Sequence, residues 1–112
     1  HGEQRFMNLA KMMKQAQELQ GKMASMQEEL ALSEIEGSSG GGMVTALMSG
    51  KHELKRLTID PSLVTPDDTE VLEDLIVAAV KDARVRVEAH VKEEMSKMTG
   101  GLNLPAGLNL PF

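Results

Sequence analysis

The sequence contains no cysteine, no tryptophan and no tyrosine, and Phe6 and Phe112 are its only aromatic residues. The lack of cysteine excludes disulfide bonds and thiol chemistry. The scarcity of aromatic side chains removes the residues that usually bring the largest buried areas to a core. We therefore expect this chain of 112 residues to bury apolar surface against a second copy of itself and to form a homodimer.

Long apolar runs are also missing. The longest unbroken run, Leu75 to Val80, is too short to cross a bilayer, and the opening HGEQRF has no apolar signal core. We therefore expect a cytoplasmic protein with no membrane partner, organised as one domain over residues 1–112. Residues 1–6 are expected to be either flexible or non-native, with Met7 as a natural start.

Positive charge is in deficit, because 12 basic residues stand against 17 acidic ones and give a net charge of −5. Such a balance by itself argues against a nucleic-acid partner. The charges are nevertheless sorted along the chain. Residues 1–27 carry four basic and two acidic side chains, whereas residues 28–36 and 67–74 are acidic. The middle of the chain is therefore acidic, and its two ends are mildly basic.

A narrow apolar stripe marks the first long segment, LAKMMKQAQELQGKMASMQEEL at positions 9–30. Its apolar residues alternate in spacing between three and four, which predicts a helix from about Phe6 to Ala31 with a coiled-coil seam. Gly21 is the weak point of this helix and costs roughly 1 kcal/mol relative to alanine. We expect the seam to pack against the second helix and a second copy. The seam consists of Leu9, Met12, Ala16, Leu19, Met23, Met26 and Leu30.

The central segment changes to a period of two. Alternation within Met43–Ser49 and Leu54–Ile59 predicts two strands, and a short strand is expected within Leu32–Glu36. The glycine-rich residues 37–42 are expected to form a flexible loop, and Gly50-Lys51 a two-residue hairpin turn.

A second long helix is predicted from about Pro66 to Met98. Thr65 can cap it, and Gly100-Gly101 ends it. The fold class is therefore α+β, with a long N-terminal helix, a three-stranded antiparallel sheet, a long C-terminal helix, and helix ends that project from a homodimer. Antiparallel helices would bring the basic ends together at one tip and the acidic segments together at the opposite end. The apolar tail at residues 99–112 repeats GLNLP and is expected to lie in a groove of its own dimer.

No motif for catalysis or metal binding stands out. The GSSGGG stretch lacks the Gly-Lys-Ser/Thr step into a helix that a phosphate loop requires. His90 with Glu93 and Glu94 could be imagined as metal ligands, but a solvated helix surface explains them without further ligands. No nucleophile is paired with a base. The sequence therefore predicts neither an enzyme nor a metal, cofactor or small-molecule substrate.

Four stretches together resemble the YbaB/EbfC family of bacterial nucleoid-associated proteins, over about Leu9 to Pro111. They are LAKMMKQAQELQGKM, EGSSGGGMVTALMSGKHELKRLTIDPSLV, EVLEDLIVAAVKDA and KMTGGLNLP. The resemblance implies a homodimer with a shared sheet, whose long helices project as tweezers around duplex DNA in the nucleoid. It also implies little sequence specificity, no catalysis and no metal.

With this resemblance, the basic helix ends become the expected DNA contact. Phosphate is the expected target, because the chain offers no aromatic side chain for base stacking there. The alternative is a homodimeric coiled-coil adaptor that binds a protein partner through its methionine-rich face or its apolar tail. The residues expected to contact DNA are Arg5, Lys11, Lys14, Lys22, Arg84, Arg86, Lys92 and Lys97.

Overall fold

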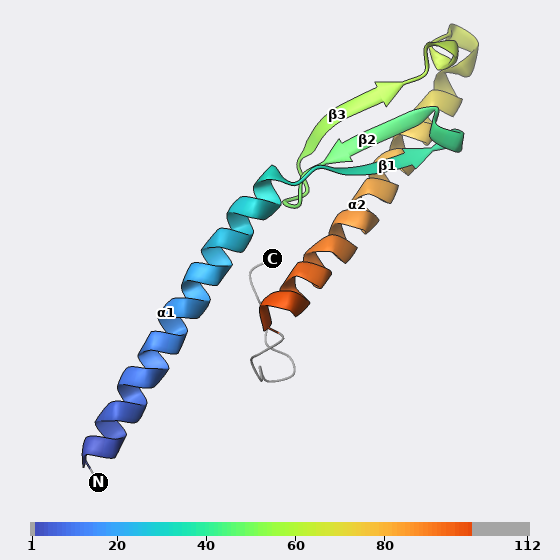
Figure 1. Ribbon diagram of the computed structural model, residues 1–112. Coiled ribbons are helices and arrows are strands. Elements are labelled where there is room, and N and C mark those ends of the chain that lie inside the picture. The colour runs from blue at the N-terminus through green and yellow to red at the C-terminus, as the bar shows by residue number, and fades with distance from the viewer. Residues whose placement is uncertain (1, 100–112) are drawn as a thin grey trace.

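The computed structural model describes residues 2–99 and has the predicted α+β architecture, with a helix, a three-stranded antiparallel sheet and a second helix (Figure 1). Residues 100–112 of the predicted apolar tail lie outside these residues. The strand order in the sheet follows the chain order, β1-β2-β3. The helices and strands are α1 (Gly2–Leu32), β1 (Ile35–Ser39), β2 (Val44–Met48), β3 (Leu54–Ile59) and α2 (Thr69–Thr99).

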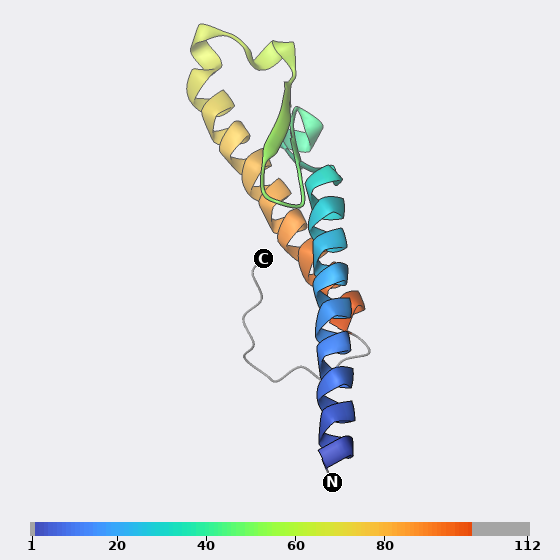
Figure 2. The same ribbon diagram turned by 90° about the vertical axis from the view of Figure 1, so that its left-hand side faces the viewer.

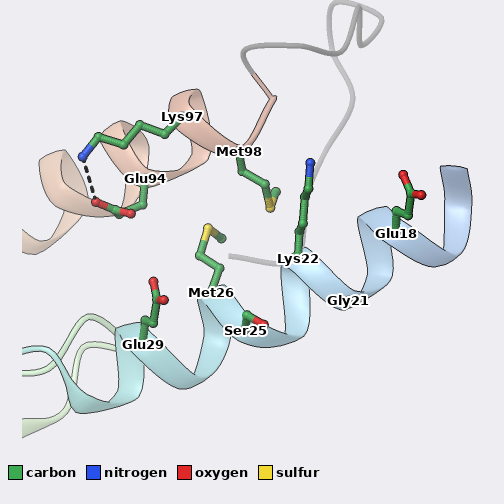
Figure 3. Close-up of a pocket in the computed structure, with 9 residues that line it drawn as sticks. All are labelled: Glu18, Gly21, Lys22, Ser25, Met26, Glu29, Glu94, Lys97 and Met98. Atoms are coloured by element: carbon green, nitrogen blue, oxygen red, sulfur yellow. Dashed lines mark hydrogen bonds and ion pairs between the residues drawn. The ribbon is translucent and has the colours of Figure 1, made fainter.

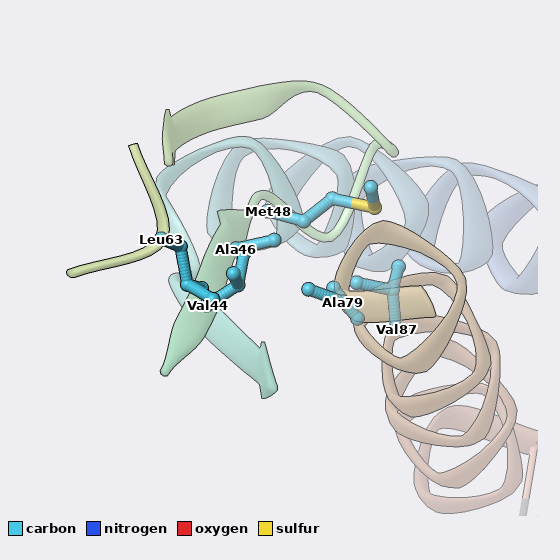
Figure 4. Packing of buried hydrophobic residues seen from close by; sticks show 7 residues of the cluster. Val44, Ala46, Met48, Leu63, Ala79 and Val87 are labelled. Atoms are coloured by element: carbon cyan, nitrogen blue, oxygen red, sulfur yellow. The ribbon is translucent and has the colours of Figure 1, made fainter. Parts of the chain in front are cut away.

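The central strand β2 confirms the predicted alternation. Val44, Ala46 and Met48 are buried and face α2, whereas the residues between them are half-buried on the other side of the sheet. Figure 4 shows these side chains next to Ala79 and Val87 of α2. The apolar core is therefore a single thin layer between the sheet and α2.

The predicted loop at residues 37–42 is wrong in its first half, because strand β1 continues through Gly37 to Ser39. A β-carbon on Gly37 would lie 2.5 Å from the Cα of Ala83 and 2.8 Å from the carbonyl oxygen of Ala79. Only glycine lets the backbones of β1 and α2 approach so closely. The glycine that suggested a loop is therefore a packing requirement of the sheet.

Two hydrogen bonds hold α2 against this same strand. The Ser39 hydroxyl donates to the Leu75 carbonyl at 2.6 Å, and the Ser38 backbone N–H donates to the Asp82 carboxylate at 2.9 Å. The Ser38 N–H first, and then the Arg86 guanidinium, lower the pKa of the Asp82 carboxyl. The ionised carboxylate thus contributes to the contact between α2 and β1.

The predicted two-residue hairpin turn is also wrong, because residues 49–53 form a longer turn. Ser49 is fully buried, its N–H donates to the Glu53 carbonyl at 2.8 Å, and its hydroxyl accepts from the Lys51 and Glu53 N–H groups. His52 closes the turn with a φ of 64°, a conformation that glycine usually supplies. The spacing of turn residues in the sequence did not indicate this arrangement.

The turn also fixes the end of α1. The Gly50 N–H donates to the Leu30 carbonyl at 2.8 Å, and a β-carbon on Gly50 would lie 2.8 Å from that same oxygen. From this attachment α1 runs away from the sheet, and the molecule extends over 79 × 24 × 16 Å (Figures 1 and 2). Of the predicted seam, Met26 and Leu30 are buried, whereas Leu9 and Met12 are 56% and 64% exposed.

We predict that Gly37→Ala lowers the free energy of unfolding by about 1–3 kcal/mol, because the new methyl group would overlap the α2 backbone. Gly21→Ala is the matched control. Its β-carbon meets nothing within 4 Å, so it should stabilise the protein by roughly 0.5–1 kcal/mol. Urea unfolding at one protein concentration measures both changes, and equal midpoints for the Gly37 variant and the unmodified protein would contradict the packing described here.

We predict that Asp82→Asn reduces stability at neutral pH and that this effect fades in acid. The folded pKa of Asp82 is lowered, so its ionised form stabilises the fold above its ordinary pKa of about 3.9. That stabilisation is lost as the pH falls through the lowered folded pKa. Denaturant unfolding between about pH 6 and pH 3 should show the difference between the two proteins shrinking, and a constant difference would contradict the assignment.

Candidate nucleic-acid interface

The two helices run antiparallel, but the end of α2 meets the later half of α1 and not its start. Glu94, Lys97 and Met98 of α2 face a segment of α1 across a cleft of about 680 Å³ (Figure 3). The α1 side of this cleft consists of Glu18, Gly21, Lys22, Ser25, Met26 and Glu29. Residues 2–17 of α1 therefore project beyond the end of α2, as Figures 1 and 2 both show.

The face of α1 that lines the cleft continues onto this projecting part. Glu18 and Lys22 are four residues apart, and residues three or four positions apart share a helical face. Counting back from Glu18 in the same steps places Lys14 and Lys11 on that face. Both lysines are exposed, and no carboxylate of the described residues lies within ion-pair distance of either.

The cleft itself does not concentrate positive charge. Lys22 and Lys97 are brought together there, but three carboxylates line the same space. Lys97 is 3.4 Å from Glu94 and 3.8 Å from Glu93. The free positive charge of this face therefore lies beyond the cleft, on the projecting part of α1.

The prediction that the basic helix ends meet at one tip is wrong for Arg84 and Arg86. The first two-thirds of α2, which contain both arginines, lie along the sheet. Arg86 binds Asp82 at 3.1 Å beside β1, and Arg84 is 3.8 Å from Glu88. Lys92 is exposed in the last third of α2. Arg5 is exposed near the start of α1. The structure thus groups Arg5, Lys11 and Lys14 on the projecting segment and separates them from Arg84 and Arg86.

The acidic segments do not gather at one end either. Residues 28–36 lie where α1 joins the sheet, and residues 67–74 lie at the far end of the sheet where α2 begins (Figure 1). Strand β1 runs between them, from Ile35 to the contact of Ser39 with Leu75. Negative charge therefore flanks the sheet at both ends, and the projecting part of α1 remains the segment without an acidic cluster.

An apolar groove, which the sequence patterns did not predict, lies beside α2. This helix packs mainly on β1 and β2 and leaves β3 largely uncovered. The groove has a volume of about 620 Å³, and Val77 stands in it 67% exposed. Its walls and rim are formed by Met48, His52, Ile76, Val77, Val80, Lys81 and Arg84. Exposed valines on a helix face are the one sequence signal that could have indicated it.

Residues 2–99 contain no group of three histidine, cysteine, aspartate or glutamate side chains placed to hold a metal ion. No helix within these residues combines the length and the apolar character that crossing a membrane requires.

Comparison with known proteins gives a consistent result. The profile described as the YbaB/EbfC DNA-binding family matches residues 5–102. A nucleoid-associated protein of Granulibacter bethesdensis is 58% identical over 105 residues, which cover 94% of this chain and 98% of that protein. A nucleoid-associated protein of Paramagnetospirillum magneticum is 60% identical with the same coverage of both chains.

A solved structure shares the fold as well. The crystal structure of an uncharacterized protein from Helicobacter pylori matches with a TM-score of 0.70 and 27% identity, over 80% of this chain and 94% of that one. The matched family is a DNA-binding family and not an enzyme family, so the prediction that the chain is not an enzyme is confirmed. The profile spans most of the chain, and the relatives are more than half identical to it over nearly its whole length, so this protein belongs to the YbaB/EbfC DNA-binding family.

Proposed function

We propose that this protein acts in the cytoplasm as a nucleoid-associated homodimer that binds duplex DNA through backbone phosphates, with little sequence specificity. The observation that carries the proposal is the projecting part of α1, which presents Lys11 and Lys14 on one exposed face with no carboxylate of the described residues as a partner. Unpaired lysines on a stiff helix can contact phosphates without reading bases. DNA binding of this kind affects nucleoid organisation or gene expression.

The remaining basic residues contribute unequally under this proposal. Arg5 and Lys22 lie on the same helix as the two lysines, and Lys92 and Lys97 lie in the last third of α2. Arg84 and Arg86 are each held by a neighbouring carboxylate beside the sheet. We therefore expect the contact to centre on α1, with Arg84 and Arg86 contributing least.

The proposed homodimer forms through the apolar groove beside α2. Among the described residues, the largest fully buried side chains are Val44, Val87 and Ser49, which is a small core for two helices of 31 residues each. A second copy would bury the exposed Val77 and further cover the half-buried Leu57 and Ile59 on the inner face of β3, which would complete that core. Two copies of α1 would then project from one central body.

The alternative function, a homodimeric adaptor for a protein partner, draws support from the methionine-rich face of α1. On this face, formed by Met12, Met23 and Met26, Met12 is 64% exposed and Met23 is half-buried, and methionines adapt to varied apolar partners. Salt separates the two functions, since phosphate binding weakens steeply with salt through counterion release and an apolar contact hardly responds.

We predict that Lys11→Glu with Lys14→Glu strongly weakens binding to duplex DNA of any sequence. If both protomers engage, up to about four phosphate contacts are lost and the slope of log K against log salt flattens by roughly 3 to 4. The fold should survive because both residues are exposed. Gel-shift titrations of random duplexes at several salt concentrations measure the change.

The matched control reverses two lysines on the hairpin, Lys51→Glu with Lys55→Glu. This pair is also exposed, and its reversal changes the net charge equally. The hairpin reversal should weaken DNA binding less than the reversal of Lys11 and Lys14 does. If the hairpin reversal abolishes binding while the α1 reversal leaves it intact, DNA lies on the sheet and the proposed interface is wrong.

We predict that Val77→Asp converts the homodimer to a folded monomer at low micromolar concentration. Val77 is 67% exposed in a single protomer, so a carboxylate there costs the monomer little but would be buried without a partner in the dimer. Val85→Asp is the matched control, because Val85 is 50% exposed and does not line the groove. Sedimentation equilibrium should show a monomer for the first variant and a dimer for the second. A dimer for both would place the interface elsewhere.

A further inference from the structure

An uncovered apolar stripe runs along the projecting part of α1. Phe6 is 73% exposed, Leu9 56%, Met12 64% and Met13 58%. The stripe continues toward the sheet through the half-buried Leu19 and Met23, and the described residues provide no cover for its outer half. Contiguous apolar surface of this kind marks a site that another segment covers.

We propose that residues 101–111 of the same chain cover this stripe, with the second GLNLP copy near Leu9 and Met12 and the first near Leu19 and Met23. This inference is independent of DNA binding, because it concerns the side of α1 that carries the seam. Lys11 and Lys14 occupy the neighbouring face and would stay in solvent.

The position where α2 ends supports this occupant. Met98 lines the cleft together with Lys22 and Met26 (Figure 3), and Met26 lies one helical turn after Met23, so the chain leaves α2 about one turn from the inner end of the stripe. The 13 residues that follow Thr99 can span at most about 43 Å, whereas the helix from residue 22 back to residue 2 is about 30 Å long. The tail is therefore long enough to reach the end of α1.

The composition of the tail fits an apolar helix face. Residues 99–112 contain no charged side chain and carry Leu102, Leu104, Leu108, Leu110 and Phe112. Pro105 and Pro111 disfavour helical geometry in the residues before them, which favours an extended segment. In an extended segment the two leucines of each copy point to the same side. Burying them against α1 removes apolar surface of both segments from water without burying a charge.

The spacing of the repeat also matches the stripe. The two copies are six residues apart, which corresponds to about 19 Å in an extended chain. On α1, the pair Leu19 and Met23 is centred about 16 Å from the pair Leu9 and Met12. The difference is smaller than one helical turn, so each copy can meet one apolar pair in turn.

Paramagnetic relaxation enhancement in the full-length protein tests this placement. The chain has no cysteine and nine methionines, so Asn103→Cys and Asn109→Cys each provide a single site for a nitroxide label, and the methionine methyl groups are the probes. Among the methionines of α1, we expect the label at 103 to broaden Met23 most and the label at 109 to broaden Met12 and Met13 most. Met43 and Met48 of the sheet should keep their intensity.

A second pair of variants tests the contact itself. Leu108→Asp with Leu110→Asp should restore the Met12 and Met13 signals in the protein labelled at 109, whereas Ala106→Asp, which adds charge between the repeats, should leave them broadened. Unaffected α1 methyl groups would overturn the proposal, and so would a label at 103 that broadens Met12 and a label at 109 that broadens Met23.

Samples that mix labelled chains with isotope-enriched chains identify the occupant. Broadening that appears between different chains, and not within one, would assign the stripe to the partner's tail and overturn the placement proposed here.

Discussion

The close approach of α2 to β1 at Gly37 determines most of this structure. A side chain at that position would overlap the backbone of Ala83 and the carbonyl oxygen of Ala79, so α2 can lie across the sheet only where β1 has glycine. The Ser39 and Ser38 hydrogen bonds to α2 then fix the helix along the strand. Because α2 packs mainly on β1 and β2, the inner side of β3 is only partly covered, and the groove that contains Val77 lies open beside α2.

A second close contact sets the direction of α1. Position 50 leaves no room for a side chain because the last turn of α1 packs directly against it. The Gly50 N–H donates a hydrogen bond to the Leu30 carbonyl oxygen. The sheet thus holds α1 by one end only, and the helix extends past the end of α2. A long helix without glycine-rich breaks can keep an extended shape, which is what presenting Lys11 and Lys14 away from the acidic sheet region requires.

The elements predicted from the sequence were those with strong periodicity. The spacing of three and four residues predicted both helices, and the period of two predicted β2 and β3. Strand β1 was partly missed because Gly37, Ser38 and Ser39 have the composition of a loop, and the reason for them is contact with a helix about forty residues later. The five-residue turn was missed because it depends on the positive φ of His52 and the burial of Ser49.

The candidate site was predictable only along one helix. Lys11 and Lys14 could be placed on a common face by counting residues. Arg84 and Arg86 could not be placed, because a pattern of residues does not show how much of α2 the sheet occupies before the helix projects. The groove beside α2 was missed for the same reason, since Met48 and His52 form it together with one face of α2.

The central claim is that the projecting face of α1 contacts DNA phosphates, and lysine footprinting tests it without any substitution. The protein is acetylated briefly with and without random duplex DNA, and the modification of each lysine is measured by mass spectrometry. The account predicts that DNA protects Lys11 and Lys14 while Lys51 and Lys55 react as before. Protection of Lys51 and Lys55 with unchanged reactivity of Lys11 and Lys14 would contradict it.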